Sequence, residues 1–324
     1  MSSTVILASG LADLATAIAA LTVHGAWPRS DPSRISVILV GHRVSLPDNL
    51  ANSFRKAAAQ SFNFSDIEVF RWGEDQAELE AFSKSRSGAD VVVANQLQDP
   101  RQRALVAALR PRQFIFYDNG LSSYSEHDVD LVSWAGELVN CRHFFAYLSY
   151  SDVFGDPAYL RPFQTTSLSP SALSMSMAEV RKGCVPLTDQ LPEGAVVILG
   201  TSFDRTNIIS ASDELRIHQE LLAVIGERHG GPIYFKPHPR ANQTYLGEAD
   251  GVIPLSAELP VEAFVSSSDG TAYSFSSTAL FSLPEMFGWD AYRVQHPLME
   301  RVFDARPQLA KIKVLAPSLV LEMS

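Results

Sequence analysis

Short apolar runs rich in β-branched and aromatic residues recur along the first half of the chain, and helix-spaced apolar residues separate them. The runs lie at 4–8, 35–40, 67–70, 90–94 and 114–117, and polar or turn-forming residues follow each one. After the first run, Leu11, Leu14, Ile18 and Leu21 mark one apolar helix face, and Ser9 is predicted to cap that helix. Strands that alternate with helices in this way predict a parallel sheet flanked by helices.

The alternation starts again in the second half, with predicted strands at 195–199, 233–235, near 252, at 272–275 and at 291–294, and a predicted helix at 213–229. Between the halves lies a stretch rich in serine, threonine and proline, with one short helix expected at 178–182. We therefore expect an α/β protein with two Rossmann-like, doubly wound domains facing a cleft. The expected parts are an N-terminal domain at 1–165, a linker at 166–193 and a C-terminal domain at 194–324. The sequence leaves open whether the last helix packs back on the N-terminal domain.

The composition and net charge of the chain limit the kinds of ligand and the location that we expect for the protein. The chain has 324 residues, of which 46% are hydrophobic and 19% charged, and this is typical of a folded protein. Its net charge of −10 argues against general attraction to nucleic acid or anionic lipid, so an anionic ligand needs a local site. Two cysteines suit a reducing cytoplasm, and no apolar stretch is long enough to span a membrane. We expect a cytoplasmic protein, with peripheral attachment at the inner face of the membrane left open.

Asp118, Asn119 and Gly120 directly follow the apolar run at 114–117. An aspartate at the carboxyl end of a strand, before an Asn-Gly turn, places a carboxylate at the expected cleft, where a general base would act. The same residues also suit an ordinary turn, because Asn and Gly tolerate the backbone angles that turns require. Both interpretations remain open on this segment alone.

Lys236, His238 and Arg240 stand two residues apart in the sequence Lys-Pro-His-Pro-Arg, after the run at 233–235. Three nitrogen donors so close together suggest an anion site, and the prolines stiffen the backbone around the imidazole. Alternatively, the histidine is a surface group with ordinary partners. A second His-Pro pair begins at His296, and we interpret that one as structural.

Hydroxyl groups gather before a predicted helix that starts near 279, where Ser276 and Ser277 precede Thr278. Hydroxyls and free N–H groups at a helix N-terminus bind phosphate, although one Ser or Thr there also serves simply as a cap. Gly200 follows the first strand of the second domain, where a glycine lets a nucleotide approach the backbone. Glu262 is a candidate for ribose hydroxyls, or only a carboxylate that favours the positive end of a helix.

P-loop, dinucleotide-binding, serine-hydrolase and zincin motifs are absent from the sequence. We therefore expect neither a cofactor nor a metal, and predict that protein cations and dipoles neutralise a leaving phosphate.

Four segments of the chain resemble, in the same order, the motif series of bacterial sialyltransferases and polysialyltransferases of the two-Rossmann (GT-B) type. They are Asp118-Asn119-Gly120, Lys236-Pro237-His238-Pro239, Pro260-Val261-Glu262 and Ser276-Ser277. Those families carry an acidic-acidic-Gly motif in the first domain, and His-Pro and Ser-Ser or Ser-Thr motifs in the second. The opening segment LASGLADLATAIAAL is also similar to that of the polysialyltransferase group. The chain departs from the pattern at Asn119, where those families have a second acidic residue, and Asp118 is the better match for the base.

The resemblance implies an inverting, metal-independent glycosyltransferase that moves sialic acid, or a related nonulosonic acid, from a CMP-activated co-substrate to a glycan hydroxyl in bacterial surface glycan synthesis. It implies these roles: Asp118 as general base; His238, Ser276 and Ser277 on the CMP phosphate; Lys236, Gly200 and Glu262 on the nucleoside; and Ser9, Gly10, Asn119 and Gly120 on the acceptor side. Two alternatives are a transferase with another donor, such as CMP-Kdo or CDP-glycerol, and a non-catalytic protein that binds a nucleotide or sugar.

Overall fold

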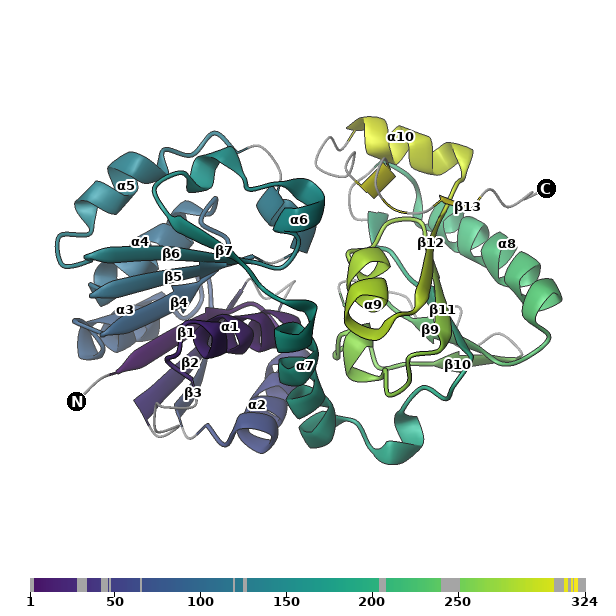
Figure 1. Ribbon diagram of the computed structural model, residues 1–324, viewed down its shortest axis with the longest axis horizontal. Helices are drawn as coiled ribbons and strands as arrows, with labels where there is room; N and C mark the ends of the chain where they lie inside the picture. The colour runs from purple at the N-terminus through teal and green to yellow at the C-terminus, as the bar shows by residue number, and fades with distance from the viewer. Residues whose placement is uncertain are drawn as a thin grey trace. The chain divides into compact units, whose positions relative to one another are not determined.

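The computed structural model describes residues 3–27, 34–41, 46, 48–64, 66–118, 120–124, 127–203, 208–239, 251–305, 312–313, 316 and 318–319. The chain divides into two compact units, Met1–Val185 and Pro186–Ser324 (Figure 1). Each unit is an α/β domain built on its own parallel sheet.

Among the described residues, the first unit holds a seven-stranded sheet in the order β3-β2-β1-β4-β5-β6-β7. The strands are β1 (Thr4–Ala8), β2 (Ile35–Gly41), β3 (Asp66–Arg71), β4 (Val91–Ala94), β5 (Gln113–Tyr117), β6 (His143–Leu148) and β7 (Gln164–Ser167). All neighbouring strands pair in parallel. The chain moves outward from β1 in one direction and then restarts on its other side at β4, which makes the β1/β4 boundary the topological switch point.

The helices of the first unit are α1 (Leu11–Val23), α2 (Asp48–Phe62), α3 (Gln76–Ser85), α4 (Pro100–Leu109), α5 (Leu131–Glu137), α6 (Ser151–Phe154) and α7 (Pro170–Cys184), with the 3-10 turns η2 (Gly120–Tyr124) and η3 (Ala158–Leu160). Helix α7 packs on α1 and α2, and α3 packs on α4 (Figure 1). Because crossovers in parallel sheets are right-handed, the reversal at β1 sends these two groups of helices to opposite faces. Both faces of the central strands are thus covered, and every residue of β1 is buried.

The second unit holds, in its described part, a six-stranded parallel sheet in the order β10-β9-β8-β11-β12-β13. Its elements are η4 (Leu187–Asp189), β8 (Ala195–Leu199), α8 (Ala211–His229), β9 (Ile233–Lys236), β10 (Val252–Pro254), η7 (Val261–Ala263), β11 (Gly270–Ser274), α9 (Ala279–Phe287), β12 (Asp290–Val294), α10 (Pro297–Ala305) and β13 (Ser318–Leu319). The order reverses between β8 and β11, which is the switch point of this domain. None of the helices among the described residues is long and apolar enough to cross a membrane.

The predicted α/β class and the two doubly wound domains are confirmed. Each predicted strand has a counterpart within about two residues, whereas β6, β7 and β13 were not predicted. The predicted cleft, and the return of the last helix to the first domain, stay predictions.

Two local expectations differ from the structure. The N-cap of α1 is Gly10 rather than Ser9, and it makes no side-chain capping bond. The Ser9 hydroxyl instead accepts from Gln96 Nε2 at 3.1 Å, while its backbone N–H donates to Asp13 Oδ2 at 3.0 Å. A tertiary contact has therefore replaced the expected cap.

The segment 166–193, expected as a linker, contains the end of β7 and the whole of α7. The expected short helix is 15 residues long, because Ser169 caps its start by accepting from Ala172 N at 3.2 Å and its apolar face packs on α1 and α2. The division between the two units falls within this segment, between Val185 and Pro186.

Candidate active site

Asp118 lies directly after β5, at the carboxyl edge of the first sheet, and only 1% of it is exposed. Three donors hold its carboxylate. The Tyr124 hydroxyl donates to Oδ2 at 2.7 Å and the Ser149 backbone N–H donates to the same oxygen at 3.0 Å. The Ser149 hydroxyl donates to Oδ1 at 2.7 Å. The carboxylate is thus enclosed by its own domain and fixed in orientation.

Burial raises the pKa of Asp118 from its ordinary value of 3.8 to about 6, while the hydrogen bonds from Ser149 and Tyr124 oppose that rise. Desolvation dominates because the charged form loses water on every side. A carboxyl group with a pKa near 6 is ionised at neutral pH and is a stronger base than an exposed aspartate.

Strand pairing explains why these groups meet. Strand β6 runs parallel to β5 with Tyr147 opposite Tyr117, and the N–H of Asp118 donates to the Tyr147 carbonyl at 3.3 Å. Ser149 follows the end of β6 and so reaches the carboxylate. Gly120, with a φ of 74°, opens η2, which brings Tyr124 back over Asp118. A side chain at Gly120 would strain that turn, so the predicted turn function of the glycine is confirmed. Asn119 lies outside the described residues.

Ser9 and Gly10 lie at the switch point, two strands away from Asp118. Ile6 pairs with Val93, and Val93 pairs with Ile115. Three residues further along each chain segment, the same register places Gln96 between Ser9 and Asp118. Gln96 has a φ of 52°, a conformation that is uncommon outside glycine. Its side chain bonds to Ser9, as described above. The structure thus aligns the predicted acceptor residue Ser9 with Asp118 along one edge of the sheet, through a residue that the sequence analysis missed.

In the second unit, the structure brings Gly200, Lys236 and His238 together. The N–H of Gly200 donates to the Lys236 carbonyl at 2.9 Å. A Cβ on Gly200 would lie 3.0 Å from the Phe235 ring and 3.3 Å from the His238 backbone nitrogen. The glycine therefore allows the ends of β8 and β9 to pack closely, whether or not a nucleotide also approaches there.

Lys236 points into the protein rather than toward a surface anion site. Its ammonium is buried and donates to the carbonyls of Pro237 at 2.7 Å and Ala257 at 3.3 Å. Burial lowers the pKa of Lys236 to about 8, and the nearby Glu262 carboxylate opposes that fall. His238 is half-buried at the edge, and Arg240 lies outside the described residues. Of the expected cluster of nitrogen donors, the described part thus leaves His238 at the edge of the sheet, whereas the amine of Lys236 is buried.

Ser276 and Ser277 lie beyond β11 on the other side of β8. Leu199 of β8 is in register with both Lys236 and Ser274, so His238 and Ser276 each stand two residues beyond that level. The Ser277 hydroxyl accepts from Ala279 N at 3.2 Å, which is a capping contact. For the Ser276 hydroxyl, no hydrogen-bond partner occurs within the described residues.

Glu262, on η7, lies beside helix α9. Its carboxylate accepts from the hydroxyl of Ser282. It also lies close enough to Lys236 to favour the charged amine. The hydroxyl of Ser282 thus holds one oxygen of this carboxylate.

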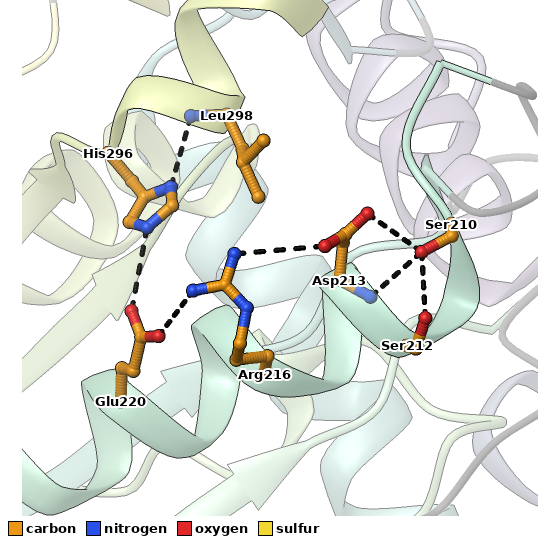
Figure 2. Close-up of polar contacts among 7 residues, drawn as sticks. All are labelled: Ser210, Ser212, Asp213, Arg216, Glu220, His296 and Leu298. Carbon is orange, nitrogen blue, oxygen red and sulfur yellow. Dashed lines mark hydrogen bonds and ion pairs between the residues drawn. The ribbon is translucent and has the colours of Figure 1, made fainter.

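His296 has the structural role that the sequence analysis gave it (Figure 2). Its Nδ1 accepts from the N–H of Leu298 at 3.1 Å at the start of α10, and its Nε2 lies 3.5 Å from Glu220 of α8. Glu220 also accepts from Arg216 at 2.6 Å. Burial lowers the pKa of His296, against the opposing Glu220 charge. A neutral ring with its proton on Nε2 satisfies both contacts, so His296 ties α10 to α8.

The carboxylate of Asp130, which belongs to a sequence pattern typical of metal sites, has a structural role. The sequence contains one Asp-x-Asp triplet at Asp128–Asp130, a pattern that can hold a divalent cation. Asp130, however, is the N-cap of α5 and accepts from the Ser133 N–H at 3.0 Å and its hydroxyl at 2.6 Å. In the part of the chain that the structure describes, no three His, Cys, Asp or Glu side chains are grouped to hold a metal ion.

Ser149 and Tyr124, like Gln96, are residues of this site that the sequence analysis missed. The signal for Ser149 was the apolar run Phe144–Leu148, which has the pattern of the other strands and is followed by a Ser-Tyr-Ser sequence. Tyr124 carries no such signal, because its contact with Asp118 depends on the path of η2.

The sequence profile of a family described as alpha-2,8-polysialyltransferase matches residues 36–293. No curated protein matches the chain. A solved UDP-GlcNAc 2-epimerase from Methanocaldococcus jannaschii is similar in structure, with a TM-score of 0.56 and 11% identity over 100% of this chain and 89% of that one.

A second structure of a Methanocaldococcus jannaschii UDP-GlcNAc 2-epimerase, in complex with UDP-GlcNAc and UDP, gives a TM-score of 0.53 and 10% identity over 98% of this chain and 93% of that one. A spinosyn rhamnosyltransferase in complex with thymidine diphosphate gives 0.48 and 10% identity over 99% of this chain and 86% of that one. At these identities the epimerase structures support the fold alone, which is of the GT-B type.

Proposed function

Since the chain belongs to the alpha-2,8-polysialyltransferase family and is thus a glycosyltransferase that uses CMP-sialic acid, we propose that it catalyses inverting, metal-independent transfer with Asp118 as the general base. The observation that carries the proposal is the buried carboxylate of Asp118, fixed by three donors at the carboxyl edge of the first sheet. In open α/β sheets, this edge is where ligands bind.

The acceptor is proposed to be a glycan that ends in sialic acid, following the alpha-2,8 linkage in the family description. Asp118 accepts the proton of the attacking hydroxyl, whose oxygen bonds to the anomeric carbon while CMP leaves. One base acts in a single displacement, which inverts the configuration at that carbon. Ser9, Gly10, Asn119 and Gly120 remain proposed acceptor-side residues.

The donor is proposed to bind at the carboxyl edge of the second sheet, where His238 and Ser276 extend on either side of β8. His238, Ser276 and Ser277 would bind the CMP phosphate, and Gly200, Lys236 and Glu262 the nucleoside side. A leaving phosphate needs its growing negative charge neutralised, and the imidazole, the N-terminus of α9 and the buried Lys236 charge can supply this without a metal.

The test is a transfer assay from CMP-sialic acid to an oligosialic acid, with and without a chelator, on the wild type, Asp118→Ala and His238→Ala. We expect Asp118→Ala to abolish transfer while CMP affinity stays unchanged. We expect His238→Ala to lower the rate of transfer by about 100-fold or more and to weaken CMP binding as well. Activity that disappears with the chelator and returns with Mg²⁺ would contradict metal independence. Transfer at the wild-type rate by Asp118→Ala would remove that residue from its proposed role.

Membership of the family sets aside the alternative of a non-catalytic binding protein and favours CMP-sialic acid over CMP-Kdo or CDP-glycerol. That the protein works in the cytoplasm, at the inner face of the membrane, stays a prediction.

A further inference from the structure

The proposed base has little direct access to a substrate. Asp118 is 1% exposed, and two donors, from Tyr124 and from the backbone of Ser149, occupy its Oδ2. Its Oδ1 has one donor within the described residues, the hydroxyl of Ser149 at 2.7 Å. A carboxylate this enclosed needs another group to carry a proton to it from a substrate.

Ser149 has the position that such a group requires. It follows β6 at the carboxyl edge of the sheet, and it is half-buried, whereas Asp118 is fully buried. A hydroxyl carries one proton and two lone pairs. The proton of Ser149 is directed at Asp118 Oδ1, and within the described residues no donor occupies its lone pairs. The hydroxyl can therefore accept a proton on one side while it donates on the other.

We propose that Ser149 is a catalytic residue that relays the proton of the acceptor hydroxyl to Asp118. This inference rests on the proposed function, because it takes Asp118 as the final base. The acceptor O–H proton passes to Ser149 Oγ while the proton of Ser149 passes to Asp118 Oδ1. The acceptor oxygen bonds to the anomeric carbon, the bond from that carbon to the phosphate oxygen breaks, and CMP leaves with the electron pair. The proton on Asp118 later returns to solvent through the same hydroxyl.

The test compares Ser149→Ala and Ser149→Thr with the wild type in single-turnover transfer from CMP-sialic acid to an oligosialic acid, at a pH well above 6. Ser151→Ala is the matched control, because that hydroxyl lies two residues away and contacts Ser167 rather than Asp118. We expect Ser149→Ala to lower the rate by about 100-fold or more with CMP affinity unchanged. Ser149→Thr, which keeps a hydroxyl, should stay within about tenfold of the wild type, and Ser151→Ala should equal it.

A relay moves two protons in one step, whereas a base that acts directly moves one. Rates measured in mixtures of H₂O and D₂O should therefore follow a curved dependence on the deuterium fraction in the wild type and in Ser149→Thr. A linear dependence in the wild type would overturn the relay, and so would a Ser149→Ala rate close to that of the wild type. If Ser149 only positioned Asp118, a higher pH would restore the rate of Ser149→Ala, and this outcome would also overturn the proposal.

Asp118→Asn separates a failure of this inference from a failure of the proposed function. If Asp118→Asn retains transfer, the proposed base is wrong and the relay falls with it. If Asp118→Asn is inactive while Ser149→Ala is active, only the relay is wrong. Loss of transfer in both variants, with CMP binding intact and a curved isotope dependence in the wild type, supports the relay.

Discussion

The hydroxyl of Tyr124 donates to Oδ2 of Asp118 at 2.7 Å. The same hydroxyl accepts the backbone N–H of Tyr150 at 2.7 Å, so the tyrosine links the carboxylate to the segment after β6. Burial raises the pKa of Tyr124, and the negative charge of Asp118 raises it further. The phenol therefore stays protonated at neutral pH and donates to the carboxylate.

Tyr124→Phe should move the acid limb of the pH–rate profile to higher pH. The hydrogen bond from Tyr124 favours the charged form of Asp118, and a bond to a charged group contributes about 1.5–3 kcal/mol. Its loss should raise the pKa of Asp118 by about one to two units, and transfer should then need a correspondingly higher pH. The measurement is kcat/KM against pH.

Tyr159→Phe is the matched control, because its hydroxyl donates to the carbonyl of Ser123 at 2.7 Å and not to Asp118. Its acid limb should coincide with that of the wild type. If the limb of Tyr124→Phe also coincides, the tyrosine does not tune the base.

Asp118→Asn should stabilise the protein at neutral and alkaline pH. The pKa of this carboxyl group rises from 3.8 to about 6 on folding, so its contribution to stability is fully present below pH 3.8 and is lost as the pH rises through 6. Above pH 6 the folded protein keeps a buried charge at a cost of about 3 kcal/mol. Asparagine has the same shape, and its NH₂ can donate to the Ser149 oxygen.

The measurement is the free energy of unfolding of the wild type and of Asp118→Asn at pH 8 and pH 4. We expect the variant to be more stable by up to about 3 kcal/mol at pH 8 and about equal at pH 4. A gain of the same size at both pH values would show that the carboxylate is not the source. A variant that loses transfer but gains stability is expected where a residue is retained for function at a cost in stability.

The parts of this site that the sequence predicts are those that one strand and its following turn determine. Asp118 was found because an apolar run, an aspartate and an Asn-Gly pair are adjacent in the chain, and the structure places it at a strand end as expected. Ser149 lies 31 residues further on, and its contact depends on the pairing of β5 with β6. No local pattern determines which strands are neighbours, so the partner of the base could not be predicted.

For Lys236 and Ser9, the sequence likewise could not predict which way the side chain points. Composition placed the amine of Lys236 in an anion-binding cluster, but the carbonyls of Pro237 and Ala257 hold it inside the protein. Ser9 has the residue type of a cap, but Gln96, from another strand connection, binds its hydroxyl. At Ser9 a tertiary hydrogen bond replaces the expected cap, and at Lys236 one bond to the adjacent residue and one to a distant residue set the position of the amine.

Gly270→Ala should destabilise the second unit. A Cβ on Gly270, at the start of β11, would lie 2.4 Å from Cε2 of the Trp289 indole. That ring is buried, and its N–H donates to the Ser267 carbonyl at 2.8 Å, so it has little freedom to move. Overpacking of this kind costs about 1–3 kcal/mol or more.

Gly226→Ala is the control for this substitution, because Gly226 lies in α8 and its added Cβ would meet only the Ile233 side chain at 3.9 Å. Alanine inside a helix is favoured over glycine by about 1 kcal/mol. Chemical denaturation should therefore give changes of opposite sign for the two variants. Equal stabilities of Gly270→Ala and the wild type would mean that the indole can shift without cost.

His218 should make the second unit sensitive to acid. The imidazole is fully buried in α8, its Nδ1–H donates to the Glu214 carbonyl at 2.7 Å, and its ring meets that of Phe275 edge-on, with the ring centroids 5.1 Å apart. Burial lowers the pKa of His218 from 6.5 to about 4, against the small opposing effect of that hydrogen bond. The contribution of the neutral ring is therefore present above pH 6.5 and is lost as the pH falls through 4.

His218→Phe keeps an aromatic ring in the same place and removes the titration. Between pH 7 and pH 4, the free energy of unfolding of the wild type should fall by up to about 3 kcal/mol more than that of the variant. The difference between the two proteins isolates this histidine, because Asp118 and every other acid titrates in both. His229→Phe, at an exposed position of the same helix, should keep the acid sensitivity of the wild type. Parallel losses in the wild type and in His218→Phe would show that the charging of His218 does not limit stability in acid.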